Sequence, residues 1–269
     1  RSGIGFKKLT RILLTHAHLD HILGLGGLVS TFTHWEKLDE LTIYGGISTL
    51  QRVQRLLNDV VLVGQTPDMP IYYEAIEEGL IHQGKGYQVQ TFPITHRGRG
   101  NFAYLFKEDD HRPFLAEKAE GLGIPAGPER GRLVRGESIT LADGQIITPE
   151  MVLGDTEIGT KVVITGDTAR TDNILPYAQN ADVLVTEATF LEEEREVAAQ
   201  FGHITARQAA ELARDANVRH LILTHVSRRY RESDVRKEAT SIFPNTIIAR
   251  DMDHFRIRRG QPLVKVEPE

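Results

Sequence analysis

Short apolar runs rich in β-branched residues alternate along the chain with stretches that have a helical pattern. The runs have the length of strands, and polar or turn residues bound them: Arg11–Leu14, Leu41–Tyr44, Val89–Ile94, Val162–Thr165, Val183–Val185, Leu221–Leu223 and Thr246–Ala249. Thr205–Asn217 predicts a helix, because Thr205 can cap its start and Gln208 completes a capping box. The alternation predicts an α/β fold, and we expect a single domain over residues 1–269.

Residues 107–160 depart from this alternation. Glycine and proline interrupt the segment at short intervals, at Pro113, Gly121, Gly123, Pro125, Gly127, Pro128, Gly131, Gly136 and Pro149. Such a density of turn residues is not typical of a core segment. The pattern predicts an insertion within the domain that forms a protruding arm.

The densest group of chemically active side chains follows the first apolar run, in Thr15-His16-Ala17-His18-Leu19-Asp20-His21. Imidazole and carboxylate suit zinc, iron or manganese. A strand that ends here, a tight loop and a helix would bring three imidazoles and one carboxylate to one point. The alternative is a polar surface turn, but three histidines at this spacing are hard to explain by composition.

Ligand-type side chains also follow four later strands, at His96, Asp167, Glu187 and His225. Binding groups collect at the carboxyl ends of strands in α/β sheets, so we expect these loops to meet at one site. The candidate metal ligands are His16, His18, Asp20, His21, His96, Asp167 and His225. Seven ligands exceed the roughly four of a tetrahedral zinc and suit two divalent ions that share Asp167. Two ions can clamp both oxygens of a displacement at phosphorus.

Composition narrows the possible partners and the compartment. The chain has no cysteine, which excludes disulfides and thiolate ligands and is compatible with a cytoplasmic location. No apolar run approaches the roughly 18 residues of a membrane span.

The net charge of −5 means that nucleic-acid binding must rest on local basic groups. Such groups follow two candidate ligands or lie in the insertion: Arg97, Arg99, Arg228, Arg229 and Arg231, then Arg130, Arg132 and Arg135. Guanidinium groups in these places suit phosphates.

The motif His16-Ala17-His18-Leu19-Asp20-His21 resembles the signature of the metallo-β-lactamase superfamily, and Gly166-Asp167-Thr168 resembles its bridging-aspartate turn. Within it, nearly the whole chain resembles the ribonuclease Z family, endonucleases that mature the 3′ end of tRNA. The more specific marks are Ala181–Thr189, Gly202–Thr205, Leu223–Tyr230, and Gly127-Pro128 followed by Leu133 and Gly136, which is similar to the Gly-Pro motif of the family's tRNA-binding exosite. Two positions differ: Leu19 replaces the usual Gly, and Thr186 a frequent His.

The resemblance implies an αββα sandwich and a division of the ligands. One ion would lie on His16, His18 and His96, the other on Asp20, His21 and His225, with Asp167 bridging them. Zinc is the expected metal, and manganese and iron(II) are alternatives. The resemblance also implies a homodimer in which one arm reaches tRNA bound by the partner.

The implied reaction is attack by a dimetal hydroxide on a phosphodiester at the 3′ end of precursor tRNA, with Asp20 holding or deprotonating the water. His203, oriented by Glu187, would be the general acid for the leaving ribose oxygen. The alternative for His203 is a helix-entry residue bonded to backbone. Expected substrate contacts are Arg228, Tyr230, Gly127, Pro128, Arg130 and Arg132.

Two other functions stay open from the sequence. One is a small-molecule hydrolase of the same superfamily, such as a phosphodiesterase, an arylsulfatase-like enzyme or a thioester hydrolase. A small substrate has no use for the insertion, which favours the nuclease. The other is a non-catalytic RNA- or metal-binding module. The presence of both His203 and Glu187 beside a complete ligand set argues against it.

The opening residues, Arg1 to Phe6, lead to the first ligand-bearing strand almost at once. Proteins of the ribonuclease Z family have further strands and a glycine-rich turn before it. We therefore expect a sheet without its opening strands, with an unpaired edge. A version extended upstream should melt at a higher temperature and cleave tRNA faster; equal melting and activity would contradict this expectation.

Overall fold

The computed structural model describes residues 9–34, 38–64, 67 and 69–267. The chain divides into two compact units. The first unit contains the described residues up to Lys107 and those from Thr160 onward, and the second is Glu108–Gly159. The residues on which the expectation of missing opening strands rests, Arg1 to Phe6, lie outside the described part.

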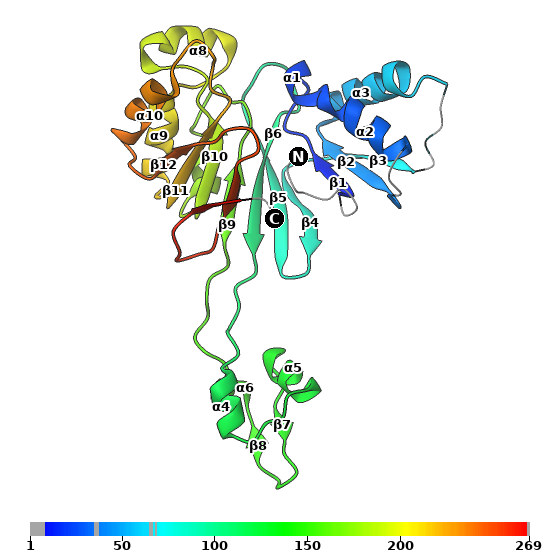
Figure 1. Ribbon diagram of the computed structural model, residues 1–269, viewed down its shortest axis with the longest axis vertical. Helices are drawn as coiled ribbons and strands as arrows, with labels where there is room; N and C mark the ends of the chain where they lie inside the picture. Colours follow the sequence, from blue (N-terminus) through cyan, green and yellow to red (C-terminus); the bar gives the residue numbers. More distant parts are fainter. Residues whose placement is uncertain (1–8, 35–37, 65–66, 68, 268–269) are drawn as a thin grey trace. The chain divides into compact units, whose positions relative to one another are not determined.

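The first unit contains two sheets that face each other (Figure 1). The smaller has the parallel order β1 (Arg11–Leu13), β2 (Leu41–Gly45) and β3 (Ile71–Ala75). The larger has seven strands in the order β12-β11-β10-β9-β6-β5-β4. Its strands are β4 (Gly79–Gly84), β5 (Tyr87–Pro93), β6 (Phe102–Glu108), β9 (Lys161–Ile164), β10 (Val183–Glu187), β11 (His220–Thr224) and β12 (Thr246–Ile248). All seven predicted strands are present in these two sheets, whose other three strands, β3, β4 and β6, were not predicted.

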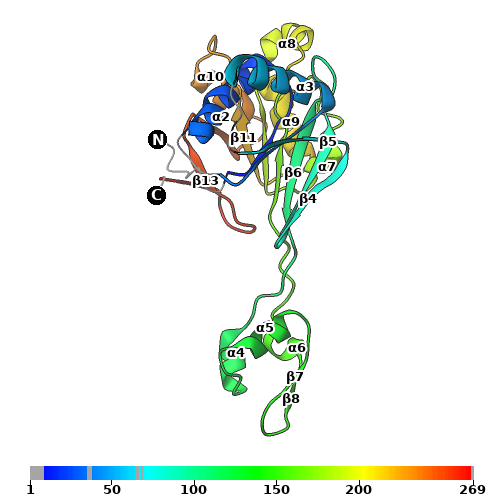
Figure 2. The ribbon, with the colours of Figure 1, turned by 90° about the vertical axis from the view of Figure 1, so that its right-hand side faces the viewer.

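Helices cover the outer faces of both sheets (Figures 1 and 2). On the small sheet lie α1 (Leu19–Ile22), α2 (Gly24–His34), α3 (Ile47–Leu56) and a π-helix, η2 (Leu57–Val61). On the large sheet lie α7 (Leu175–Ala178), η3 (Glu192–Glu194), α8 (Arg195–Phe201), α9 (Ala206–Asp215) and α10 (Glu232–Thr240). The predicted helix is α9, and Thr205 and Gln208 form the expected capping box. A hairpin of β13 (His254–Arg256) and β14 (Val264–Val266) follows β12.

Three apolar clusters hold these layers together. Phe32, Ile43 and Val53 belong to the cluster under α2 and α3, and the alanines of α9 pack against Leu184 and Leu221 of the large sheet. A smaller cluster around Ile76, Val89 and Tyr104 lies between the sheets, where the Tyr104 hydroxyl donates a hydrogen bond to Leu14 O at 2.6 Å. Burial of apolar area is the main stabilising contribution in such a sandwich. The sheets and helices supply the core, and the loops that follow the strands can carry reactive side chains.

The second unit has a separate small core. Its elements are α4 (Ala116–Gly121), α5 (Pro128–Val134), α6 (Pro149–Val152), and the short strands β7 (Ile139–Thr140) and β8 (Ile146–Ile147). The buried residues of its apolar cluster are Ala119, Ile124, Leu133, Ile139, Ile147 and Val152, all from this unit. Arg130 belongs to this structure, because its guanidinium donates to Ile124 O at 2.8 Å and to Pro125 O at 3.1 Å.

Candidate metal centre

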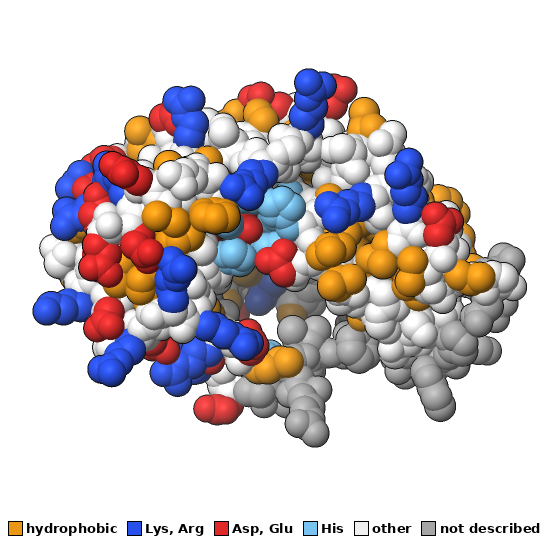
Figure 3. Space-filling view, turned by 90° about the horizontal axis from the view of Figure 1, so that it is seen from above, with side chains coloured by type: hydrophobic (Ala, Val, Ile, Leu, Met, Phe, Trp, Pro, Cys, Tyr) orange, Lys and Arg blue, Asp and Glu red, His pale blue; other side chains and the backbone are white. Residues whose placement is uncertain are grey.

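Four loops of the first unit bring imidazole and carboxylate groups to one hollow. His16 and His18 follow β1, His96 follows β5, Asp167 follows β9, and His225 follows β11. The space-filling view shows histidine side chains gathered in this hollow, with Lys or Arg side chains around its rim (Figure 3). All seven predicted ligand positions fall into groups whose possible ligand atoms lie within 4.8 Å of one another.

The Asp167 carboxylate is at the centre of the hollow. Its Oδ2 lies 3.6 Å from His16 Nε2, 3.9 Å from His96 Nε2, 3.2 Å from His21 Nε2 and 3.5 Å from His225 Nε2. Asp167 is buried, and burial alone would raise its pKa, but the surrounding imidazoles lower the pKa well below the usual range. One carboxylate oxygen therefore faces both halves of the predicted ligand set.

The remaining ligand atoms form two groups on either side of Asp167. In the first, His96 Nε2 lies 3.1 Å from His18 Nδ1, and His16 is adjacent. In the second, Asp20 Oδ2 lies 3.4 Å from both His21 Nε2 and His225 Nε2. The first group is mostly buried, whereas the Asp20 side chain is 65% exposed, so the second group is open to solvent.

These residues fit divalent metal ions. Bonds of about 2.0–2.1 Å to a tetrahedral ion place its ligand atoms about 3.3 Å apart, which is close to the distances around Asp167. His16 Nε2 is buried and has no hydrogen-bond partner among the described residues, as expected for an atom directed at an ion. Burial lowers the pKa of His16 to about 3, which keeps its imidazole neutral and able to coordinate.

Several ligands are fixed through their second ring nitrogen. His96 Nδ1 lies 2.7 Å from the carbonyl oxygen of Gly202, and His16 Nδ1 lies 3.0 Å from Thr15 Oγ1. Gly202 has φ +76°, and a Cβ there would lie 3.3 Å from His96 Nδ1, so a larger residue at this position would be strained and would crowd His96. Contacts of this kind set the tautomer and orientation of a metal-binding histidine.

His203 lies beside the two groups and is paired with Glu187. Its Nδ1 is 3.0 Å from Glu187 Oε1, and Glu187 is fully buried, with Thr168 N donating to the same oxygen at 2.6 Å. Burial alone would lower the pKa of His203, but the bond to Glu187 raises it above its ordinary value. His203 also lies close enough to Asp167 and His225 to be a ligand, so geometry alone leaves both roles open.

The predicted substrate residues lie in different settings. Arg228 is exposed, whereas Tyr230 packs partly against the core, and its hydroxyl is buried without a partner in the described part of the chain. Gly127 and Pro128 are exposed in the second unit. There, Arg132 and Arg135 share the carboxylate of Glu137, at 3.0 and 3.2 Å. Their contact with substrate stays a prediction.

The structure adds contacts around the site for Arg97, which the sequence analysis singled out, and for Thr189, which it did not. Arg97 donates to Gln200 O at 2.6 Å and lies 4.9 Å from the centre of the Phe201 ring, which fixes it near His203. Thr189 contacts Glu187 and His225. Thr186, which replaces a frequent histidine, is buried and accepts a hydrogen bond from Thr165 at 2.8 Å, so it is structural.

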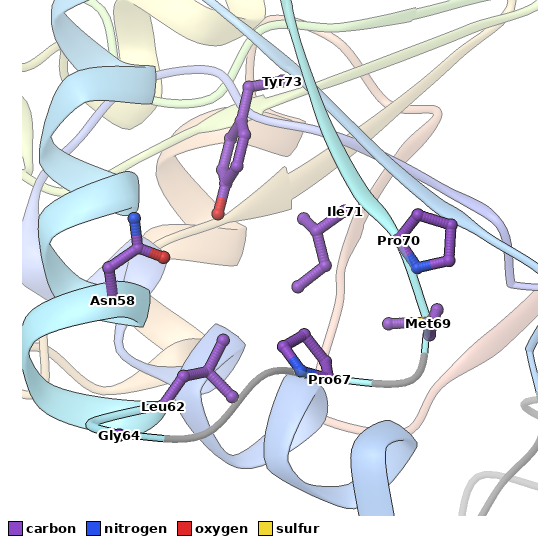
Figure 4. Close-up of a pocket in the computed structure, with 8 residues that line it drawn as sticks. All are labelled: Asn58, Leu62, Gly64, Pro67, Met69, Pro70, Ile71 and Tyr73. Carbon is purple, nitrogen blue, oxygen red and sulfur yellow. The ribbon is translucent and has the colours of Figure 1, made fainter.

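A separate cavity of about 720 Å³ lies between η2 and β3 (Figure 4). It is lined by Asn58, Leu62, Gly64, Pro67, Met69, Pro70, Ile71 and Tyr73. None of these residues is a carboxylate or an imidazole. Among the described residues, the lining of this cavity offers a metal no carboxylate or imidazole, unlike the hollow around Asp167.

Comparisons with known proteins identify the fold and the family of the chain. A sequence model of the metallo-beta-lactamase superfamily matches residues 1–34, and one of a beta-lactamase superfamily domain matches residues 150–226. Two solved structures share the fold: the metallo-beta-lactamase fold protein YhfI from Bacillus subtilis and human tRNase Z, short form. Their TM-scores are 0.60 and 0.58 and their identities 21% and 19%. They cover 91% and 94% of this chain, and 76% and 79% of those chains are covered. The chain is thus a metallo-β-lactamase fold protein, as its sequence predicted.

The curated relatives are closer in sequence. Ribonuclease Z from Bradyrhizobium diazoefficiens is 43% identical over 255 residues, which is 95% of this chain and 84% of the relative. Ribonuclease Z from Archaeoglobus fulgidus is 42% identical over 251 residues, 92% of this chain and 80% of the relative. The chain belongs to the ribonuclease Z family. Of the helices in the described ranges, none has both the length and the apolar composition that crossing a bilayer requires.

Proposed function

We propose that the protein is a metal-dependent endoribonuclease that cleaves precursor tRNA at its 3′ end. The observation that carries this proposal is the His203–Glu187 pair beside ligand groups that share Asp167. A module that only bound RNA or metal would not need an imidazole held by a buried carboxylate next to such a centre.

Two divalent ions, for which zinc is our first choice, would lower the pKa of a water so that it loses a proton and can attack phosphorus. They would also neutralise charge on the phosphate. His16, His18 and His96 would hold one ion, Asp20, His21 and His225 the other, with Asp167 between them. The Asp20 carboxylate, exposed at the mouth of the hollow, would orient the attacking water. His203 would donate a proton to the leaving ribose oxygen from Nε2, because its Nδ1 is bonded to Glu187.

Arginines near the hollow support a polyanionic substrate. Arg97 is fixed beside His203, and Arg228 is exposed three residues after His225. Guanidinium groups bind phosphates through paired hydrogen bonds, so they suit an RNA backbone on both sides of the scissile bond. We further propose a cytoplasmic homodimer in which residues 107–160 of one protomer contact the tRNA bound by the other.

The function can be tested with two substrates for the purified protein loaded with zinc. A tRNA precursor with a 3′ trailer should be cut at the trailer, and a small aryl phosphodiester should be hydrolysed with a much lower kcat/KM. If the aryl ester is hydrolysed efficiently and the tRNA precursor stays uncut, the result would instead favour a small-molecule phosphodiesterase.

Removing the second unit should affect the reactions of these two substrates differently. β6 and β9 are antiparallel, with Lys107 opposite Lys161, so an Asn-Gly turn in place of residues 108–160 should close them into a hairpin. We expect weaker precursor binding with a smaller salt dependence, because phosphate contacts of the basic residues are lost, while the aryl ester is still hydrolysed. Binding measured at several salt concentrations checks this. Equal loss on both substrates would show that the unit supports the fold instead.

A matched pair of arginine variants can refine that test. Arg132→Ala should lower the slope of tRNA affinity against salt without unfolding the unit, since the Arg132 side chain is exposed and its polar partner in the described structure is Glu137. Arg130→Ala should instead lower the melting temperature, because it removes two hydrogen bonds to backbone carbonyls. Identical effects of the two variants would contradict this division of roles.

A further inference from the structure

The hydroxyl of Thr189 connects the two parts of the candidate centre. Thr189 is the second residue after β10 and is only 8% exposed. Its Oγ1 lies 2.5 Å from Glu187 Oε2, 2.8 Å from His225 Nδ1 and 3.4 Å from His203 Nδ1. A single buried oxygen therefore contacts a predicted metal ligand, the predicted acid and the carboxylate that orients the acid.

The single hydrogen of the Thr189 hydroxyl determines the direction of each of these hydrogen bonds. A threonine hydroxyl has one hydrogen to donate and two lone pairs to accept with. The ionised Glu187 carboxylate can only accept hydrogen bonds, as it does from the amides of Thr168 and Ile204. The Thr189 hydrogen is thus directed at Glu187 Oε2, and the Thr189 oxygen is left to accept from His225 Nδ1.

This arrangement selects one tautomer of His225. With its hydrogen on Nδ1, the ring presents the lone pair of Nε2 to the hollow, where Nε2 lies 3.4 Å from Asp20 Oδ2 and 3.5 Å from Asp167 Oδ2. The backbone at His225 has φ +52°, an uncommon conformation for a residue other than glycine that directs where this side chain lies. The backbone therefore places the His225 ring, and the hydrogen bond to the Thr189 hydroxyl fixes its tautomer.

We infer that Thr189 is a positioning residue: it holds His225 in its metal-binding tautomer and, through the same hydroxyl, holds the Glu187 carboxylate that orients His203. The inference rests on the proposed metal-dependent function, and it adds that the exposed metal group and the acid pair are set by one side chain. The Gly202 carbonyl and Thr15 serve His96 and His16 in the first group, so each group has its own support.

Metal affinity tests this role apart from activity. We expect Thr189→Val, which keeps the volume and removes the hydroxyl, to weaken the more weakly held of two zinc ions by about 10–100-fold. Thr189→Ser, which keeps the hydroxyl, should bind both ions like the wild type. The measurement is competition between each variant and a chromophoric chelator for zinc alone. Thr91→Val is the matched control, because the Thr91 hydroxyl is also buried but donates to Ala103 O at 3.0 Å in the large sheet.

The outcomes separate this inference from the proposed function. A wild-type protein that binds fewer than two zinc ions would overturn the dinuclear centre itself. Two ions in the wild type, with unchanged affinity in Thr189→Val or equal weakening in Thr91→Val, would overturn only the role of Thr189. Nitrogen NMR of the metal-free wild type decides the matter if the valine variant does not fold. A hydrogen on His225 Nδ1 supports the role, and a hydrogen on Nε2 overturns it.

Discussion

Asp167→Ala should abolish phosphodiester cleavage, with kcat/KM reduced by at least about a thousandfold. The reason is that Asp167 Oδ2 lies within 3.9 Å of an imidazole nitrogen of four histidines that belong to both ligand groups. Removing the carboxylate takes a ligand from both ions and leaves the surrounding imidazoles without their central negative charge. Loss of several kcal/mol of stabilisation from the metals corresponds to a rate change of this size.

Elemental analysis and steady-state kinetics of the same preparations check this prediction. We expect about two transition-metal ions per wild-type chain and a clear loss of metal in the variant. Asp172→Ala is the control, because Asp172 follows the same strand but is exposed and paired only with Arg170 in the described structure. If a folded wild-type protein contains one ion or none, the two-ion interpretation fails.

His203→Ala should reduce turnover of precursor tRNA by about 10²–10⁴-fold, the usual contribution of a general acid. The ribose oxygen is a poor leaving group without a proton, and His203 is the imidazole that Glu187 holds at 3.0 Å. Metal content should stay near that of the wild type, because the seven other ligand positions are intact. Loss of an ion would instead assign His203 to the metal, the other role that its place beside Asp167 and His225 allows.

The leaving group distinguishes proton donation from other effects of this change. An aryl phosphodiester leaves readily without a proton, so His203→Ala should slow its hydrolysis far less than cleavage of tRNA. Glu187→Gln should follow the same pattern with a smaller effect. His82→Ala serves as the control, since the polar side-chain partner of His82 in the described structure is the Tyr87 hydroxyl, outside the candidate centre. Equal slowing on both substrates would contradict the acid role.

Much of the fold could be predicted, because strand-length apolar runs and a capping box are local signals. The runs at Val183–Val185 and Leu221–Leu223 became β10 and β11, and Thr205 caps α9. β3 and β4 escaped prediction, since their alternating residues are only partly buried and their pairing depends on distant strands. β6 has an apolar run of the same kind as β10 and β11, with Ala103, Tyr104 and Leu105 buried, and was missed despite this local signal.

The site was predictable where one residue type repeats at a strand end, as His16, His18 and His21 do. It was not predictable where a contact depends on folding. Thr189 is an ordinary threonine in the sequence, and only the approach of β11 to β10 places His225 Nδ1 at 2.8 Å from its hydroxyl. Arg130 was likewise predicted only as a contact for the RNA backbone, whereas its guanidinium also donates to two carbonyl oxygens of its own unit.

The pairing of β6 with β9 affects which changes this sequence can accept during evolution. In the connectivity of the large sheet, all of Glu108–Gly159 is the loop of a β-hairpin. Lengthening a loop costs little, because each doubling adds only about 0.6 kcal/mol of closure entropy. Insertions, deletions or replacement of the whole unit can thus accumulate there without a shift in the register of the sheet that carries Asp167 and Glu187. Under the proposed function, the junction of β6 and β9 is a place where substrate recognition can change during evolution while the residues of the metal centre stay the same.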